Sequence, residues 1–427
     1  MISLAVLVLV LAVLMMLRMP VAFAMGLAGA AGLAIQLGPR PALAVLERVF
    51  IDSTSSFILV AIPLFILMAE LLTAGQVTRR AIQACQAWIG HVRGGLGIAT
   101  VGASVLLAAL IGSSTASTAA MAASAYPEMR RHGFNERLAA AVVSVGGTLA
   151  VVVPPSIVLV VYGVLTETSI GKLFIAGVVP GLMTALGIMT VIKIISHTTD
   201  YAPAGEPFRF GHAVRTSRHV VPMVVLILAV IGVIYGGIAS PSEAAAVGVL
   251  GALVLGLAQR TLKLRALPPS VSMAVSSTVM IVTIISCSHI FASYLSFTRV
   301  TQDLLVLIET SGLSRGMIMG LMIVTLLVMG MFMDQLAILS LAMPLAFPAA
   351  MALGYDPVWF GIVVTKTVEI GLITPPLGLN AYVAAGQCNL RLGEVFRGLM
   401  PFILMELLVL LLLLFFPDIT LWLPGMM

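Results

Sequence analysis

Charged residues are scarce in this 427-residue chain, and their scarcity excludes a water-soluble protein. Asp, Glu, Lys and Arg together make up 9% of the residues, whereas soluble domains carry about 25%. Hydrophobic residues make up 60% of the chain. They form repeated apolar runs of roughly 18 residues or more, the length of a membrane-spanning helix. The composition predicts an all-α polytopic membrane protein, because the short alternating strands of a membrane barrel are not seen.

Cysteine and histidine are also sparse, and this excludes several kinds of site. Cys85, Cys287 and Cys388 form no C-x-x-C spacing, so we expect neither a disulfide framework nor a cysteine metal site. The six histidines form no ligand pair on one helix face. No basic patch interleaves with aromatic residues, so the net charge of +5 does not indicate a nucleic-acid partner. We find neither an HExxH motif nor a nucleophile paired with a base, which argues against an intramembrane hydrolase. We predict that the protein is not an enzyme and binds no cofactor.

The first apolar run ends at its first charge, Arg18. A signal peptide carries positive charge before its apolar run. We therefore interpret residues 1–18 as a transmembrane helix that begins outside the cell.

Proline positions indicate an internal duplication. When the sequence is shifted by 221 residues, prolines of the first half fall on prolines of the second: Pro20 on Pro241, Pro127 on Pro348, Pro154 and Pro155 on Pro375 and Pro376, and Pro180 on Pro401. Chance would give roughly half a match at one shift. We predict two repeats, 1–206 and 222–427, joined by a cytoplasmic linker at 207–221.

Each half contains an interrupted apolar segment followed by a span that a Pro-Pro pair breaks. The interrupted segments cover about 96–127 and 314–348, and the broken spans cover about 136–165 and 357–386. An interrupted segment could be two full spans or one re-entrant hairpin. We favour hairpins, because the polar residues in the middle of each segment are too few for a loop between full spans. Each half then crosses the membrane five times, so the second repeat is inverted relative to the first.

Positive charge fixes the predicted orientation. With hairpins, sixteen of the 22 Lys and Arg residues, including Arg130 and Arg131, lie on one face, and five, including Lys172 and Arg315, lie on the other. The positive-inside rule makes the first face cytoplasmic. Both termini are then periplasmic or extracellular. Two full spans in place of each hairpin would give the same result, so charge does not decide between them.

The helix breaks point to transport. Secondary transporters bind substrates and ions near the bilayer midplane, on discontinuous helices of inverted repeats. A broken helix frees carbonyl oxygens that can ligate a cation, and it presents N–H groups to an anion. The hairpin turns, "IGSSTAS" and "MFMDQLA", fall at corresponding positions, with Ser113 opposite Asp334. A channel is an alternative, but it does not require two inverted broken-helix sites.

Six motifs together resemble the large membrane subunit of tripartite ATP-independent periplasmic (TRAP) transporters. In chain order they are "AIPLFILMAELL", "GSSTASTAAMAAS", "VVVPPSI", "SPSEAAAVG", "GMFMD" and "EIGLITPPLGLN". The fourth motif, which begins SPSEAAA, departs slightly from the usual Thr-Glu form of the family. The resemblance covers essentially the whole chain. It implies an elevator-type fold in the bacterial inner membrane, a separate small four-helix membrane subunit and a periplasmic substrate-binding protein. It also implies sodium-coupled import of organic acids, commonly carboxylates such as C4-dicarboxylates or sialic acid.

We assign candidate residues on this basis. Sodium, as the coupling ion, is expected at the hairpin turns and at carbonyls freed by the prolines: Ser113, Ser114, Val153, Ser156, Asp334, Gly371 and Thr374. Candidates for substrate binding are Gly112, Thr115, Thr148 and Asn380, and the helix-breaking residues are Pro154, Pro155, Pro375 and Pro376. No arginine lies at mid-depth, so sodium and helix dipoles would neutralise the anion. The closest alternative is an anion/sodium carrier of the same broad fold that uses no binding protein.

Three other polar features are expected to be structural. Lys366 and Glu369 have i,i+3 spacing and are predicted to pair with each other. Glu243 follows Pro241 and suits the first turn of a helix. His289 is expected to form a hydrogen bond within the helix bundle.

Overall fold

The computed structural model describes residues 10, 11, 13–75, 77–203, 205, 207–218 and 220–426, and it folds them into helices joined by short turns. Residues 1–9 and 12 of the predicted first span lie outside the described residues. Within this part of the chain, seven helical segments are long and apolar enough to cross a membrane. An eighth is added if α11 (Phe210–Ser217) and α12 (Val221–Tyr235) form one bent span. The predicted all-α polytopic class is confirmed.

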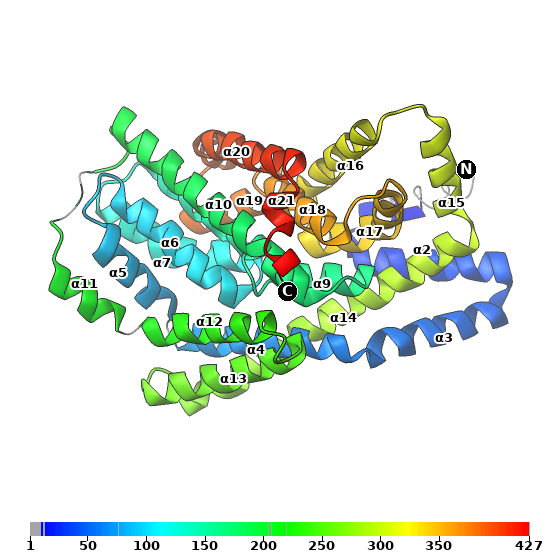
Figure 1. Cartoon of the computed structure of the whole chain (residues 1–427), viewed down its shortest axis with the longest axis horizontal. Helices are drawn as coiled ribbons and strands as arrows, with labels where there is room; N and C mark the ends of the chain where they lie inside the picture. Colours follow the sequence, from blue (N-terminus) through cyan, green and yellow to red (C-terminus); the bar gives the residue numbers. More distant parts are fainter. Residues whose placement is uncertain are drawn as a thin grey trace.

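One layer of helices runs along a side of the molecule, the lower edge in Figure 1. Besides α12, the layer contains α2 (Val21–Leu37), α3 (Pro39–Ser55), α4 (Ala61–Ala74), α13 (Pro241–Ala258) and α14 (Leu267–Phe297). The helix α14 packs against α2, α3 and α4. The helix α4 also packs against α13, which contacts α12. Only 28% of the apolar stretch within Leu264–Phe297 is buried inside the chain. The layer therefore offers a wide apolar surface to lipid or to another subunit.

The apolar segment before the first hairpin is divided in the structure. The helix α3 ends at Ser55, a 3-10 turn covers Phe57–Val60, and α4 begins at Ala61. Ser56 between them has an extended backbone. The polar run from Asp52 to Ser56 lies where the first of these helices ends.

The remaining helices form the core of the molecule. They are α5 (Val77–Ile89), α6 (Gly95–Ile111), α7 (Ser114–Arg131), α8 (Glu136–Val152), α9 (Ile157–Thr166), α10 (Ile170–Thr198), α15 (Val300–Thr310), α16 (Arg315–Gly330), α17 (Gln335–Ala352), α18 (Pro357–Gly371), α19 (Leu379–Cys388), α20 (Leu392–Phe415) and the short α21 (Asp418–Leu421). All residues of α8 from Leu138 onward and of α18 from Val358 onward are buried. The two broken spans are thus the centre of the fold.

Corresponding helices in the two halves have corresponding bounds. Adding 221 to the bounds of α7 gives 335–352, the bounds of α17. Asn135 caps α8 and Asp356, its counterpart, caps α18. These matches are what a duplicated sequence would give, whereas the orientation of each half in a bilayer stays a prediction.

Both hairpins extend beyond their predicted ends. The prediction ended the first at Pro127, but α7 continues to Arg131, and α17 continues past Pro348 to Ala352. Proline removes one backbone hydrogen bond, and a packed membrane helix can continue through it.

Candidate ion and substrate site

Each hairpin consists of two helices joined by a short turn, and the second helix begins directly after the turn. Gly112 and Ser113 separate α6 from α7, whose first residue is Ser114. Gly112 has a φ of 61°, and a Cβ atom there would lie 2.8 Å from Cγ1 of Ile157. Glycine at this position therefore allows the first turn to lie against the start of α9.

The second turn is capped by Asp334. Its Oδ2 accepts a hydrogen bond of 3.0 Å from the backbone N–H of Leu336, at the start of α17. Ser113, at the corresponding place in the first turn, makes no side-chain cap, and its Oγ lies 3.4 Å from Oγ1 of Thr115. The two turns therefore have the same position in their repeats but different chemistry.

Both Pro-Pro pairs break their helices as predicted. The first break separates α8 from α9, and the second separates α18 from α19; both Pro-Pro bonds are cis. The two breaks differ in exposure, because Pro154 and Pro155 are buried whereas Pro375 and Pro376 are exposed. The second break is therefore the accessible one in this conformation.

The segment after the second break contacts both hairpin turns. The Gly378 N–H donates to the Met331 carbonyl of the second turn at 3.1 Å. Two residues later, Asn380 Nδ2 donates to Ser114 Oγ of the first turn at 2.5 Å. Ser114 and Asn380 are both 0% exposed, so this bond lies inside the protein. The structure thus brings together predicted residues from the first hairpin and the second broken helix.

Three buried oxygen atoms, in the two hairpins and the second broken helix, lack hydrogen-bond partners in the described part of the chain. Among the described residues, Asn380 Oδ1, Gln335 Oε1 and Ser117 Oγ are buried and have no hydrogen-bond partner. Gln335 is the first residue of α17, and Ser117 lies in the first turn of α7. Buried polar atoms are usually paired, so these oxygens are available to a ligand with positive character.

A close glycine contact fixes the second hairpin against the second broken helix. A Cβ atom at Gly371 would lie 2.6 Å from Cα of Gly330. The backbones of α16 and α18 can approach this closely because both residues are glycine. Gly371, a predicted sodium candidate, is therefore at a packing contact four residues before Pro375.

Other predicted residues already have partners within their own broken spans. Ser156 Oγ donates to the Val151 carbonyl at 2.6 Å and caps α9. Thr374 Oγ1 donates to the Ile370 carbonyl at 2.6 Å. Val153 ends α8 with an extended backbone. These residues line the breaks, but the Ser156 and Thr374 side chains act locally in this conformation.

Thr148 lies in the middle of α8, apart from the turns. It is 0% exposed, donates to the Val145 carbonyl at 2.7 Å, and contacts the carboxylate of Glu369. The structure therefore places this substrate candidate in a buried polar network.

Lys366 is the centre of that network. It pairs with Glu369 Oε2 at 3.2 Å, which confirms the predicted i,i+3 pair, and it also binds Glu406 and Thr184. The sequence analysis missed Glu406 and Thr184. The available signal was a lone carboxylate in the last apolar span, because an ionisable residue within a membrane usually has a partner.

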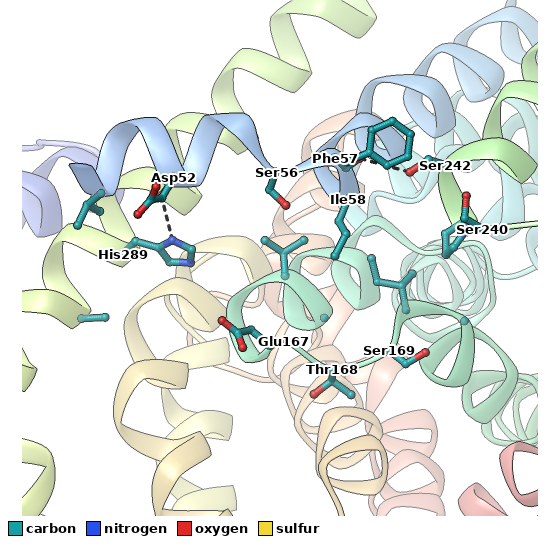
Figure 2. A pocket seen from close by; sticks show the side chains of 18 of the residues that line it. Asp52, Ser56, Phe57, Ile58, Glu167, Thr168, Ser169, Ser240, Ser242 and His289 are labelled. Atoms are coloured by element: carbon teal, nitrogen blue, oxygen red, sulfur yellow. Dashed lines mark hydrogen bonds between the residues drawn. The ribbon is translucent and has the colours of Figure 1, made fainter. Parts of the chain in front are cut away.

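A separate cavity of 1090 Å³ lies between the helix layer and the loop from α9 to α10 (Figure 2). Asp52, Glu167, Ser240 and His289 are among its lining residues. His289 Nδ1 shares a hydrogen bond of 2.9 Å with Ser53 Oγ, so its expected bundle hydrogen bond is confirmed. No sequence pattern predicts this cavity, because its lining comes from five separate segments.

The expected place of Glu243 in the first turn of a helix is confirmed. Glu243 accepts from the Ser240 backbone N–H and Ser240 caps the N–H of Glu243, forming a capping box at the start of α13. Its carboxylate is engaged at a helix end away from the hairpin turns.

Discontinuous helices that meet at buried polar turns define a class of protein, the membrane transporters with broken helices. The chain belongs to a particular family within this class. The family model for the tripartite ATP-independent periplasmic transporter, DctM component, matches residues 8–419. The protein is therefore a TRAP transporter large permease, a multi-pass membrane protein whose relatives are transporter permeases and not enzymes.

Relatives that are named for different substrates match most of the chain. The C4-dicarboxylate TRAP transporter large permease protein DctM of Pseudomonas aeruginosa is 38% identical over 402 residues, which cover 94% of this chain and 93% of that protein. The ectoine TRAP transporter large permease protein TeaC of Halomonas elongata is 35% identical, and the match covers 86% of each chain. The solved structure of the Alcanivorax borkumensis YdaH transporter has a TM-score of 0.61 at 13% identity, covering 90% and 89% of the two chains, which shows a shared fold.

Proposed function

We propose that the protein imports an organic acid anion, of the carboxylate class, by sodium symport. In this proposal a periplasmic binding protein delivers the substrate, and the hairpin turns and helix breaks hold both substrate and sodium. One observation carries the proposal. Asn380 joins the second broken helix to Ser114 of the first hairpin and keeps a buried oxygen, Oδ1, without a donor.

Sodium coupling is supported by unpaired oxygen atoms in the described parts of the two hairpins and the second broken helix. Sodium is a hard cation that takes carbonyl, hydroxyl and carboxylate oxygens, as other hard cations do. Asn380 Oδ1, Gln335 Oε1 and Ser117 Oγ are buried acceptors or hydroxyls without partners among the described residues. The Asp334 carboxylate, which has one oxygen on the Leu336 N–H, supplies a negative charge beside Gln335.

An anionic substrate is supported by the helix ends. The helices α7, α9, α17 and α19 all begin at a turn or a break, and each N-terminus carries a partial positive charge. Arginine is absent from residues 94–129, 138–198 and 316–390, which contain most of the two hairpins and of the two broken spans. Lys366 is fully buried against two glutamates, so its charge is already neutralised.

The partners in this proposal are a small four-helix membrane subunit and a periplasmic substrate-binding protein. The family description, a tripartite periplasmic transporter, supports both. The exposed apolar helix layer supplies a surface for the membrane subunit. We place the protein in the bacterial inner membrane with both termini periplasmic, and we propose that its inverted repeats move as an elevator.

A reconstitution experiment tests the proposal. The cognate binding protein is first screened against organic acids by thermal shift, which identifies the substrate without the permease. Liposomes then receive the permease with its small subunit, and uptake is measured with and without the binding protein. We expect uptake with all three components. Full uptake without the binding protein would favour the binding-protein-independent carrier instead.

A further inference from the structure

A fully buried ionic network lies between three helices of the core. Lys366 Nζ on α18 donates to Thr184 Oγ1 on α10 at 2.7 Å and to Glu369 Oε2 at 3.2 Å, and it also contacts Glu406 on α20. All four side chains are 0% exposed. One ammonium group thus holds three helices together.

The network also reaches the first repeat, through residues at equivalent positions. Glu369 contacts Thr148 of α8, and these two residues are related by the shift of 221. Each lies six positions before the first proline of its break, Pro154 or Pro375. The contact therefore joins the two broken helices at the same distance from their breaks.

A short chain of contacts leads from Glu369 to the candidate site. Leu372, three residues further along, accepts a hydrogen bond of 2.9 Å at its carbonyl from the Asn380 N–H. Asn380 in turn holds Ser114 of the first hairpin. One turn of backbone and two hydrogen bonds therefore connect Glu369 with Ser114.

Stability alone does not explain these charges. Burying an ion pair costs several kcal/mol per ion, and apolar residues of similar size often serve as well or better. In the first repeat the positions equivalent to Lys366 and Glu406 carry Val145 and Ala185. Apolar residues therefore occupy the equivalent positions in one half of the chain.

We propose that Lys366 is a positioning residue for the ion and substrate site. Its ammonium group holds the Glu369 carboxylate against Thr148, and this contact sets the second break and Asn380 relative to the first repeat. The inference rests on the proposed function in assigning sodium to the junction, but its geometric part can be measured without sodium.

The test uses the permease purified with its small subunit. Lys366→Met alone leaves two carboxylates buried, so the main variant is the triple Lys366→Met/Glu369→Gln/Glu406→Gln, which keeps the volumes and removes all three charges. The control is Thr190→Val, at an exposed position of α10 outside the network. Hydrogen exchange of residues 371–380 is measured first. Second, Tm is measured as NaCl replaces KCl at constant ionic strength. The sodium concentration that gives half of the rise in Tm is recorded.

We expect the triple variant to fold, to exchange faster at 371–380, and to need about fivefold more sodium or higher. The control should match the wild type in both measurements. Unchanged exchange and an unchanged sodium midpoint in the folded triple variant would overturn the inference. If the triple variant does not fold, Thr148→Val is measured in the same way and decides the question. It removes the hydroxyl that contacts Glu369 and donates to the Val145 carbonyl. A wild type without sodium-specific stabilisation would count against the proposed coupling, and exchange at 371–380 would still decide the role of Lys366.

Discussion

Asn380 and Ser114 lie 266 positions apart in the sequence and are joined by a hydrogen bond of 2.5 Å. One belongs to the helix after the second break and the other begins the second arm of the first hairpin. If the two repeats are inverted in the membrane, this bond marks the place where the halves meet. Through this bond the second break supplies a polar group, the Asn380 side chain, to the turn of the first hairpin.

Replacing Asn380 should disable this junction. Asn380→Ala leaves the buried Ser114 hydroxyl without its partner, a loss of about 1–3 kcal/mol, and removes the unpaired Oδ1. We expect uptake to fall at least tenfold while expression stays near normal. Gln387→Ala, on the exposed side of the same helix, is the control and should transport like the wild type. Equal uptake by both variants would remove Asn380 from the site.

Asp334 should matter more for sodium than Glu243. Asp334→Asn keeps an oxygen that can cap α17 through the Leu336 N–H and removes the charge, so the sodium concentration for half-maximal uptake should rise. Glu243→Gln alters only a capping box, worth about 1 kcal/mol of local stability. Sodium titrations of uptake by both variants check this. A shift in Glu243→Gln without one in Asp334→Asn would mean that the wrong carboxylate is assigned.

The close contact of α16 with α18 should make Gly330 sensitive to substitution. A Cβ atom at Gly330 would lie 2.9 Å from the backbone of Gly371, whereas at Gly320 of the same helix it meets nothing within 4 Å. Gly330→Ala should lower Tm. Gly320→Ala should leave Tm unchanged or raise it, because alanine favours a helix by about 1 kcal/mol. Thermal unfolding in detergent compares the two, and a Gly330→Ala variant as stable as Gly320→Ala would contradict the close packing.

The predicted topology can be tested at two exposed positions. Arg131 has a side chain that is 79% exposed, at the end of the first hairpin, and Ser311 is exposed just before the second hairpin. Single cysteines replace them in a background without Cys85, Cys287 and Cys388. An impermeant thiol reagent added to whole spheroplasts should label position 311 and spare 131 until the membrane is opened. Labelling of both from outside would exclude the inverted arrangement.

The sequence predicted the breaks but could not predict the partners across them. Proline and small polar residues act on the local backbone, so Pro154, Pro375 and the turn at Gly112 could be read from one sequence. The bond from Asn380 to Ser114 depends on how one hairpin packs against the helix of the other half, and no local pattern carries that information. Glu406 could be noticed as a lone carboxylate in an apolar span, but its pairing with Lys366 could not be predicted, since Lys366 lies 40 positions away on another helix.

The most direct test of the account is uptake driven by a sodium gradient alone. Liposomes that contain the permease and its small subunit are loaded with KCl, and binding protein carrying labelled organic acid is added outside in NaCl or in KCl at the same ionic strength. The account predicts accumulation above the external concentration in NaCl, no accumulation in KCl, and a weaker response to sodium in Asp334→Asn. Equal uptake in NaCl and KCl by the wild type would contradict it.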